Sequence, residues 1–260
     1  MPRNSAQSRA TSLCLAALAA LLVWPARGGA QHRKDFTTPT PLPSGRTLTI
    51  GFLGSGAGVA DADMPVVLLG QRLRALGLPG VYIETAEYSR RNAALKLIEA
   101  ASGRDEKGRC TANGCREVRI LLYGRGAGAE AVVKLAHELK QRNLPVALAV
   151  EVDSVASQEE VIPPNVARAA NLYGTHRLSL RGRMRIRAED PGKTLILGNL
   201  QFTEAGNWVD MSSLAEEPDL SPRKPEDETE SDPQVWNRVE DYILDELHRA
   251  GIPGAPAPPH

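Results

Sequence analysis

The segment from residue 118 to residue 135 constrains the fold of this 260-residue chain more than any other. It reads Val-Arg-Ile-Leu-Leu-Tyr-Gly-Arg-Gly-Ala-Gly-Ala-Glu-Ala-Val-Val-Lys-Leu: an apolar run, a glycine-rich hinge at 124–128, and apolar residues at helical spacing. A continuous apolar run is typical of a strand buried on both faces. The segment therefore predicts a buried strand that turns sharply into a helix.

Similar patterns of strands and helices flank this unit. Further strands are predicted at 47–51, 81–85, 145–152 and 193–202, and helices at 65–76, 91–101, 128–141 and 235–249. Strands that alternate with helices indicate a parallel sheet with helices on both faces. Ligands of such sheets bind at the carboxyl ends of the strands, where the hinge, the glycines of 54–58 and Asp153 are expected to meet.

The first 30 residues form a separate segment. Two arginines precede an apolar run over residues 12–24, and small residues follow up to Ala30. This order is that of a secretory signal peptide. The run is shorter than the ~20 apolar residues of a spanning helix, so we expect cleavage near Ala30, a periplasmic or extracellular location and no stable membrane span afterwards. Retention of the segment as an anchor is the alternative.

Composition divides the remainder of the chain. Residues 31–46 are polar and proline-rich and predict a flexible N-terminal tail, 47–249 predict the folded domain, 216–232 a mobile acidic loop, and 250–260 a disordered tail. Of 31 Lys and Arg, three lie before residue 31, which leaves 28 basic and 31 acidic residues. This balance does not favour a nucleic acid or an anionic membrane as partner.

Two cysteines remain after residue 30. Cys110 and Cys115 enclose Thr-Ala-Asn-Gly and predict a disulfide in an exported protein. A redox or metal pair is the alternative, but no second Cys/His pair lies nearby. The sequence also has no H-E-x-x-H motif and no EF-hand spacing, so we predict no metal site and no cofactor.

The hinge fits two functional motifs. Its outer glycines, Gly124 and Gly128, are those of the nucleophile elbow G-x-S-x-G, in which Gly126 occupies the serine position. Glycine has no hydroxyl with which to attack a carbonyl. The same segment through Ala129 also fits a G-x-G-x-x-A dinucleotide-binding turn, for which Glu151 could accept a ribose hydroxyl. That turn normally follows the first strand, whereas this one follows the third predicted strand.

Several stretches together resemble a known family. They are Leu122 to Ala136, Val152-Asp-Ser-Val155, Ile162-Pro-Pro-Asn-Val166, Arg185 to Pro191, Leu197-Gly-Asn199 and Asp232-Pro-Gln-Val-Trp236. In this order, over roughly 47–248, they resemble exported bacterial α/β-hydrolase-fold proteins of the lipase and esterase type. The resemblance implies an α/β-hydrolase-like three-layer sandwich with a mostly parallel central sheet.

Active members of that family carry a serine in the hinge, an aspartate after the next strand and a late histidine. By resemblance, these positions are Gly126, Asp153 and approximately Glu226. A Ser-His-Asp site needs all three groups, and two are absent. The resemblance thus implies a degenerate, non-catalytic member.

The same edge could still bind a ligand. A helix N-terminus favours an anion or a carbonyl oxygen, and Arg125 adds positive charge. We expect Gly54, Arg125, Gly126 and Ala127 to bind a small ester- or carboxylate-bearing ligand, or a protein partner.

The alternative is an active carboxylic ester hydrolase with relocated groups. His176 is the candidate base, and the candidate hydroxyls are those of Ser55, Ser154 and Ser179. His137 and His248 are interpreted as ordinary helix residues.

A further pattern, alternating arginines at 181, 183, 185 and 187, indicates either an anion-binding stripe or a charged edge strand.

Overall fold

The computed structural model of this protein describes residues 36–55, 64–155, 160–174, 185–203, 205–212 and 232–257. Several predictions lie outside the described residues: the signal peptide, most of the acidic loop, Glu226, His176, Ser179, Arg181 and Arg183. All statements below refer to the described part of the chain.

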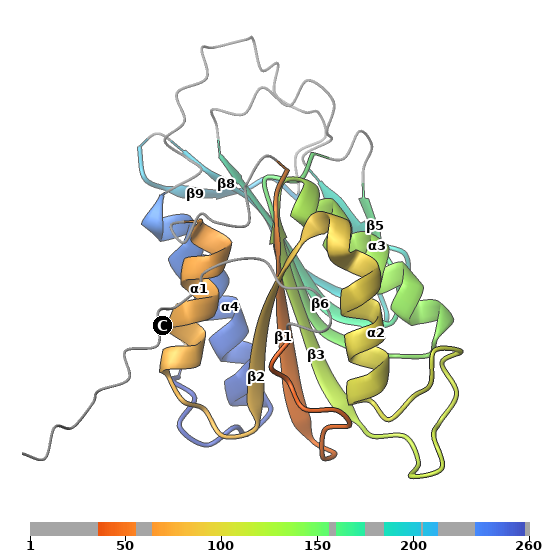
Figure 1. Ribbon diagram of the computed structural model, residues 1–260. Helices are drawn as coiled ribbons and strands as arrows, with labels where there is room; N and C mark the ends of the chain where they lie inside the picture. The colour runs from red at the N-terminus through yellow and green to blue at the C-terminus, as the bar shows by residue number, and fades with distance from the viewer. Residues whose placement is uncertain are drawn as a thin grey trace, which may run out of the picture.

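Strands and helices alternate as expected as far as residue 152, and five more strands follow before the last helix. Their order is β1 (Arg46–Leu53), α1 (Pro65–Ala75), β2 (Val81–Glu87), a 3-10 turn (Tyr88–Arg90), α2 (Arg91–Ala101), β3 (Val118–Arg125), α3 (Ala127–Gln141), β4 (Val146–Val152), β5 (Glu160–Ile162), β6 (Val166–Gly174), β7 (Ile186–Ala188), β8 (Leu195–Phe202), β9 (Trp208–Asp210) and α4 (Pro233–Arg249). The main sheet has the order β2-β1-β3-β4-β6-β8-β9, and β9 alone within it is antiparallel to its neighbour. The predicted α/β three-layer sandwich with a mostly parallel central sheet is confirmed (Figure 1).

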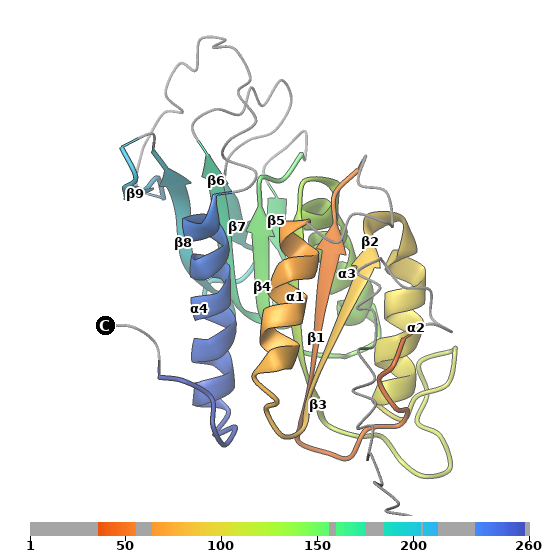
Figure 2. The same cartoon turned by 60° about the vertical axis from the view of Figure 1, so that its left-hand side comes forward.

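Helices cover both faces of the sheet. Figure 2 shows α1 and α4 side by side on one face, and α2 and α3 on the other. Each face has its own apolar core, because alternate strand residues point to opposite sides: Leu122 belongs to the α2–α3 core, and Tyr123 to the α1–α4 core. The continuous apolar runs in the sequence reflect this double burial.

The N-terminal segment differs from its prediction. Residues 36–45 do not extend away as a tail but lie against the fold, and we call them the N-terminal strap. Leu42 is fully buried in the α2–α3 core. Thr37 and Thr38 each donate a backbone N–H and a hydroxyl to one carboxylate oxygen of Glu84 on β2, at 2.7–3.1 Å. A buried carboxylate needs hydrogen-bond donors, and the polar residues of the strap supply them.

The C-terminal prediction also needs correction over its described part. Ile252 and Ala255 pack against the α1–α4 core, so residues 251–257 do not begin a free tail.

A small parallel sheet of β5 and β7 lies on the α2–α3 face of the main sheet, where β5 contacts α3. We call it the mini-sheet. Ile162 and Ile186 insert from it into the core of that face. The sequence patterns missed both of these strands because three residues show no periodicity. Of the arginine pattern, Arg185 precedes β7 and Arg187 lies within it, with an exposed side chain.

The predicted disulfide is confirmed. Cys110 and Cys115 are joined in the loop between α2 and β3. Replacing both cysteines by serine is expected to lower the free energy of unfolding by about 2 kcal/mol, because the bond restricts only a short loop of the unfolded chain. Urea unfolding of the double variant measures the loss, and the wild type under reducing conditions should match it. Equal stability of oxidised and reduced protein would contradict this expectation.

Candidate functional site

The strand order reverses direction between β1 and β3. From β1 the chain continues to β2 on one side of the sheet and then returns to β3 on the other side. In open parallel sheets, ligands bind where the strand order reverses in this way, outside the carboxyl ends of the strands. Gly54 follows β1, and Arg125 and Gly126 end β3, so the topology brings these three predicted site residues to one place.

The hinge has the backbone of a strained elbow. Gly126 adopts φ 58° and ψ −120°, a conformation that residues with a side chain rarely adopt. A Cβ on Gly124 would lie 2.3 Å from the carbonyl oxygen of Gly128, and a Cβ on Gly128 would lie 2.2 Å from that of Phe52. The two outer glycines thus allow the strand, the turn and the helix to approach closely, which is the role that the elbow motif gives them.

Asp153 lies on the neighbouring strand end. The Gly126 N–H donates to the carbonyl of Val152 at 2.9 Å, and the Asp153 N–H donates to that of Leu172 at 2.8 Å. Asp153 is 4% exposed and has φ 48°, again in the left-handed region. The position that the resemblance assigns to the acid therefore lies on the strand end next to the one that it assigns to the nucleophile.

The N-terminus of α3 gives this place its polarity. The first N–H groups of an α-helix have no helical acceptor and carry partial positive charge. Ala127 is the first residue of α3, and Arg125 precedes it by two positions with only 8% of its surface exposed. Tyr123 contacts α1 through its hydroxyl, so alternation places Arg125 on that same face of the sheet. The guanidinium is therefore an internal charge beside the elbow.

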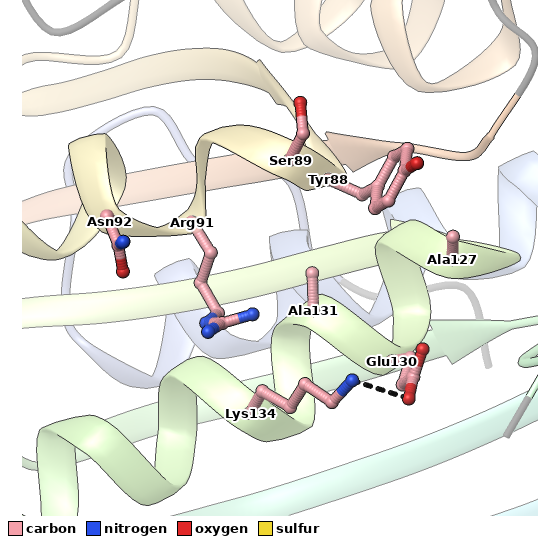
Figure 3. A pocket seen from close by; sticks show the side chains of 8 residues that line it. All are labelled: Tyr88, Ser89, Arg91, Asn92, Ala127, Glu130, Ala131 and Lys134. Atoms are coloured by element: carbon pink, nitrogen blue, oxygen red, sulfur yellow. Dashed lines mark ion pairs between the residues drawn. The ribbon is translucent and has the colours of Figure 1, made fainter.

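A cavity of about 180 Å³ adjoins the start of α3. Figure 3 shows the residues that line it: Ala127, Glu130, Ala131 and Lys134 from α3, and Tyr88, Ser89, Arg91 and Asn92 from the opposite wall. Both cations are already compensated, since Lys134 pairs with Glu130 at 2.6 Å and Arg91 with Glu138 at 3.0 Å. The cavity is thus polar but carries little net charge.

Glu151 is not placed for the ribose contact of the dinucleotide alternative. It is 1% exposed, and it lies on the α2–α3 face of β4, because Val150 and Val152 belong to the other core. Burial raises the pKa of its carboxyl well above the usual range, and the nearby Glu160 carboxylate raises it further. A carboxyl buried beneath the helices of this face has no surface to offer a ribose hydroxyl.

The two histidines within the described residues lie away from the elbow. His137 is ten residues along α3, ~15 Å from its start, and its Nε2 contacts the Val161 carbonyl at 3.0 Å. His248 is in the last turn of α4, near Glu246, which pairs with Arg119 at the beginning of β3. His248 thus lies near the amino ends of the parallel strands, whereas Asp153 lies at their carboxyl ends.

Among the candidate hydroxyls, Ser55 is exposed just after β1, and Ser154 follows Asp153. The Ser154 hydroxyl donates to Glu160 at 2.5 Å.

Within the described ranges, no three His, Cys, Asp or Glu side chains gather as metal ligands would, and no helix there has the length and hydropathy to cross a membrane.

Comparison with solved structures yields distant likenesses. One of these is to a cutinase-like protein from Cryptococcus sp., which is 16% identical, with a TM-score of 0.41 over 80% of this chain and 98% of that chain. No family model and no curated protein matches the chain. The chemistry of the site therefore has to follow from its own residues.

Proposed function

We propose that this protein is an exported, non-catalytic relative of α/β-hydrolase-fold esterases that binds a small carboxylate- or ester-bearing ligand at the former active site. The observation that carries the proposal is the strained Gly126 turn. The elbow backbone and its two closely packed glycines are present, but the residue at the turn has no nucleophilic atom. A disulfide supports an oxidising location outside the cytoplasm.

The proposed ligand would place its oxygen at the first N–H groups of α3. The Arg125 guanidinium adds positive potential there. The remainder of the ligand would enter the cavity of about 180 Å³ beside Ala127. The size favours a short acyl group rather than a long chain.

The ligand proposal is tested with butyrate and a matched pair of variants. Ala127→Asp puts a negative charge at the first position of α3, where it suits the helix dipole but repels a carboxylate. Ala127→Asn has nearly the same shape without the charge. We expect butyrate to shift the amide resonances of residues 127 and 128 in the wild type and in Ala127→Asn. Butyrate should bind at least tenfold more weakly to Ala127→Asp. Equal binding by the two variants would contradict the proposal.

The non-catalytic part of the proposal makes a second prediction. We expect no hydrolysis of p-nitrophenyl acetate or butyrate above the uncatalysed rate, and no covalent labelling by a fluorophosphonate. Gly126→Ser alone should also stay inactive, because a serine needs a base to accept its proton, and the resemblance places the histidine position near Glu226, where the sequence has no histidine. Robust turnover by that variant, or labelling of any serine in the folded wild type, would refute the non-catalytic assignment.

One observation favours an active ester hydrolase as the second candidate. The Ser154 hydroxyl bonded to Glu160 is a nucleophile next to a carboxylate base, at the same edge as Asp153. This candidate predicts fluorophosphonate labelling at Ser154, and the loss of that labelling in Ser154→Ala. The labelling experiment above therefore separates the two functions.

A further inference from the structure

The mini-sheet is held to the rest of the fold by polar contacts as well as by its two isoleucines. The side-chain amide of Asn199 on β8 accepts the Ile186 N–H at 2.7 Å and donates to the Ile186 carbonyl at 3.2 Å. His137 on α3 contacts the Val161 carbonyl of β5. On the side of β4, the mini-sheet meets Glu151 through Glu160, the first residue of β5.

Glu151 has an unusual environment for an acid. Both of its oxygens are buried, and neither has a hydrogen-bond partner of normal geometry among the described residues. The Glu160 carboxyl and the Ser154 hydroxyl are near enough to interact with it. Ser154 already donates its proton to Glu160, so it has no second proton with which to satisfy Glu151.

The two carboxyl groups have different access to water. Glu151 is 1% exposed, whereas Glu160 is partly exposed and accepts the Ser154 hydrogen bond. Two adjacent carboxylates, of which one is buried, repel one another, so one of them keeps a proton. The buried Glu151 is the member that stays neutral, and as an acid it becomes the donor that Glu160 can accept from.

We propose that Glu151 and Glu160 form a carboxylic acid–carboxylate pair that fastens the mini-sheet to β4, and that ionisation of Glu151 at alkaline pH loosens this attachment. The packed elements carry other ionisable groups: Glu130, Lys134, His137, Glu138 and Lys140 on α3, Arg187 on β7, Arg119 and Arg125 on β3, Arg168 on β6, and Asp153 after β4. None of these groups is among the causes of the raised pKa of Glu151, which are burial, Glu160 and Ser154. The inference does not depend on the proposed ligand.

The sign of the pH dependence follows from the proton count. A carboxyl whose pKa is raised on folding binds its proton more tightly in the native state than in the unfolded chain. Its contribution to stability is full below the pKa of an unfolded glutamate and is lost as pH rises toward the folded pKa. For one such group, the unfolding equilibrium constant increases up to tenfold per pH unit over that window.

The test compares the wild-type protein with Glu151→Gln and a control, Glu189→Gln. Glu189 is an exposed acid just after β7 that pairs with Lys140. Urea unfolding is measured between pH 4.5 and 8.5. We expect Glu151→Gln to remove this pH-dependent increase in the unfolding equilibrium constant. At pH 8.5 that constant should be at least tenfold smaller for Glu151→Gln than for the wild type. Glu189→Gln should retain the wild-type pH dependence.

Two further measurements keep the test decisive if Glu151→Gln folds poorly. Carboxyl carbon-13 NMR of the wild type should show Glu151 as a neutral acid at pH 6, and amide exchange over 160–162 and 186–189 should accelerate at alkaline pH beyond the intrinsic rate. An ionised Glu151 at pH 5 overturns the proposal. So does stabilisation by millimolar calcium at pH 7 that Glu151→Gln abolishes, since a metal rather than a proton would then neutralise the pair.

Discussion

Gly128→Ala is expected to destabilise the protein by about 3 kcal/mol or more, although alanine favours helices. The new Cβ would lie 2.2 Å from the carbonyl oxygen of Phe52 and 2.8 Å from that of Leu53. Both atoms belong to backbone in the middle layer, which cannot rotate away as a side chain would. To relieve the overlap, α3 has to move away from β1, and the elbow between β3 and α3 moves with it.

Gly70→Ala provides the matched control for that prediction. Gly70 is also helical, on α1, but its new Cβ would meet the side chains of Thr85 at 3.0 Å and Tyr123 at 3.3 Å. Side chains can shift by the few tenths of an ångström required, and the gain in helix propensity offsets part of the cost. We expect a change within about 1 kcal/mol, measured for both variants by urea unfolding. Similar losses in the two variants would show that close packing at the elbow is not special.

Leu42→Ala has the second large expected effect, a loss of about 2–5 kcal/mol in the free energy of unfolding. The side chain is fully buried against α2, and the Leu42 N–H donates to the Ala101 carbonyl at 2.9 Å. Truncation therefore leaves a cavity under the N-terminal strap. Thermal or urea unfolding followed by circular dichroism measures the loss.

The control for Leu42→Ala is an exposed strap residue. Ser44→Ala should change stability by no more than about 0.5 kcal/mol. If Leu42→Ala is equally mild, the strap is not a stabilising part of the domain, and the flexible tail first expected for 31–46 is the better description.

Sequence patterns predicted most of the long elements because their chemistry is repetitive, but they missed the nine-residue strand β6. The helix at 91–101 matches α2, and the strand at 118–123 lacks only the last two residues of β3. The glycines of 124–128 also predicted a sharp turn, and the structure adds that Gly126 has a backbone conformation that disfavours side chains. Here the local sequence was sufficient because each residue acts through its own backbone.

The parts that were missed depend on contacts between distant residues. The strap looks like a tail because its polar threonines are satisfied by Glu84, more than 40 positions away. β5 and β7 are too short for periodicity, and the core contacts of Ile162 and Ile186 hold them in place. Glu151 did give a signal, a charged residue near the end of an otherwise apolar strand, which we first interpreted as a ligand contact.

The pairing of α1 with α4 has a consequence for the order in which the chain can fold. The first and last helices share one core and are joined by Arg72 and Glu240 at 2.6 Å, whereas α2 and α3 are neighbours along the chain. A chain emerging from its N-terminus can complete the α2–α3 layer early. The other face of the sheet lacks α4 until residue 249 has been synthesised. During that interval the emerging chain exposes apolar sheet surface that can associate with other chains.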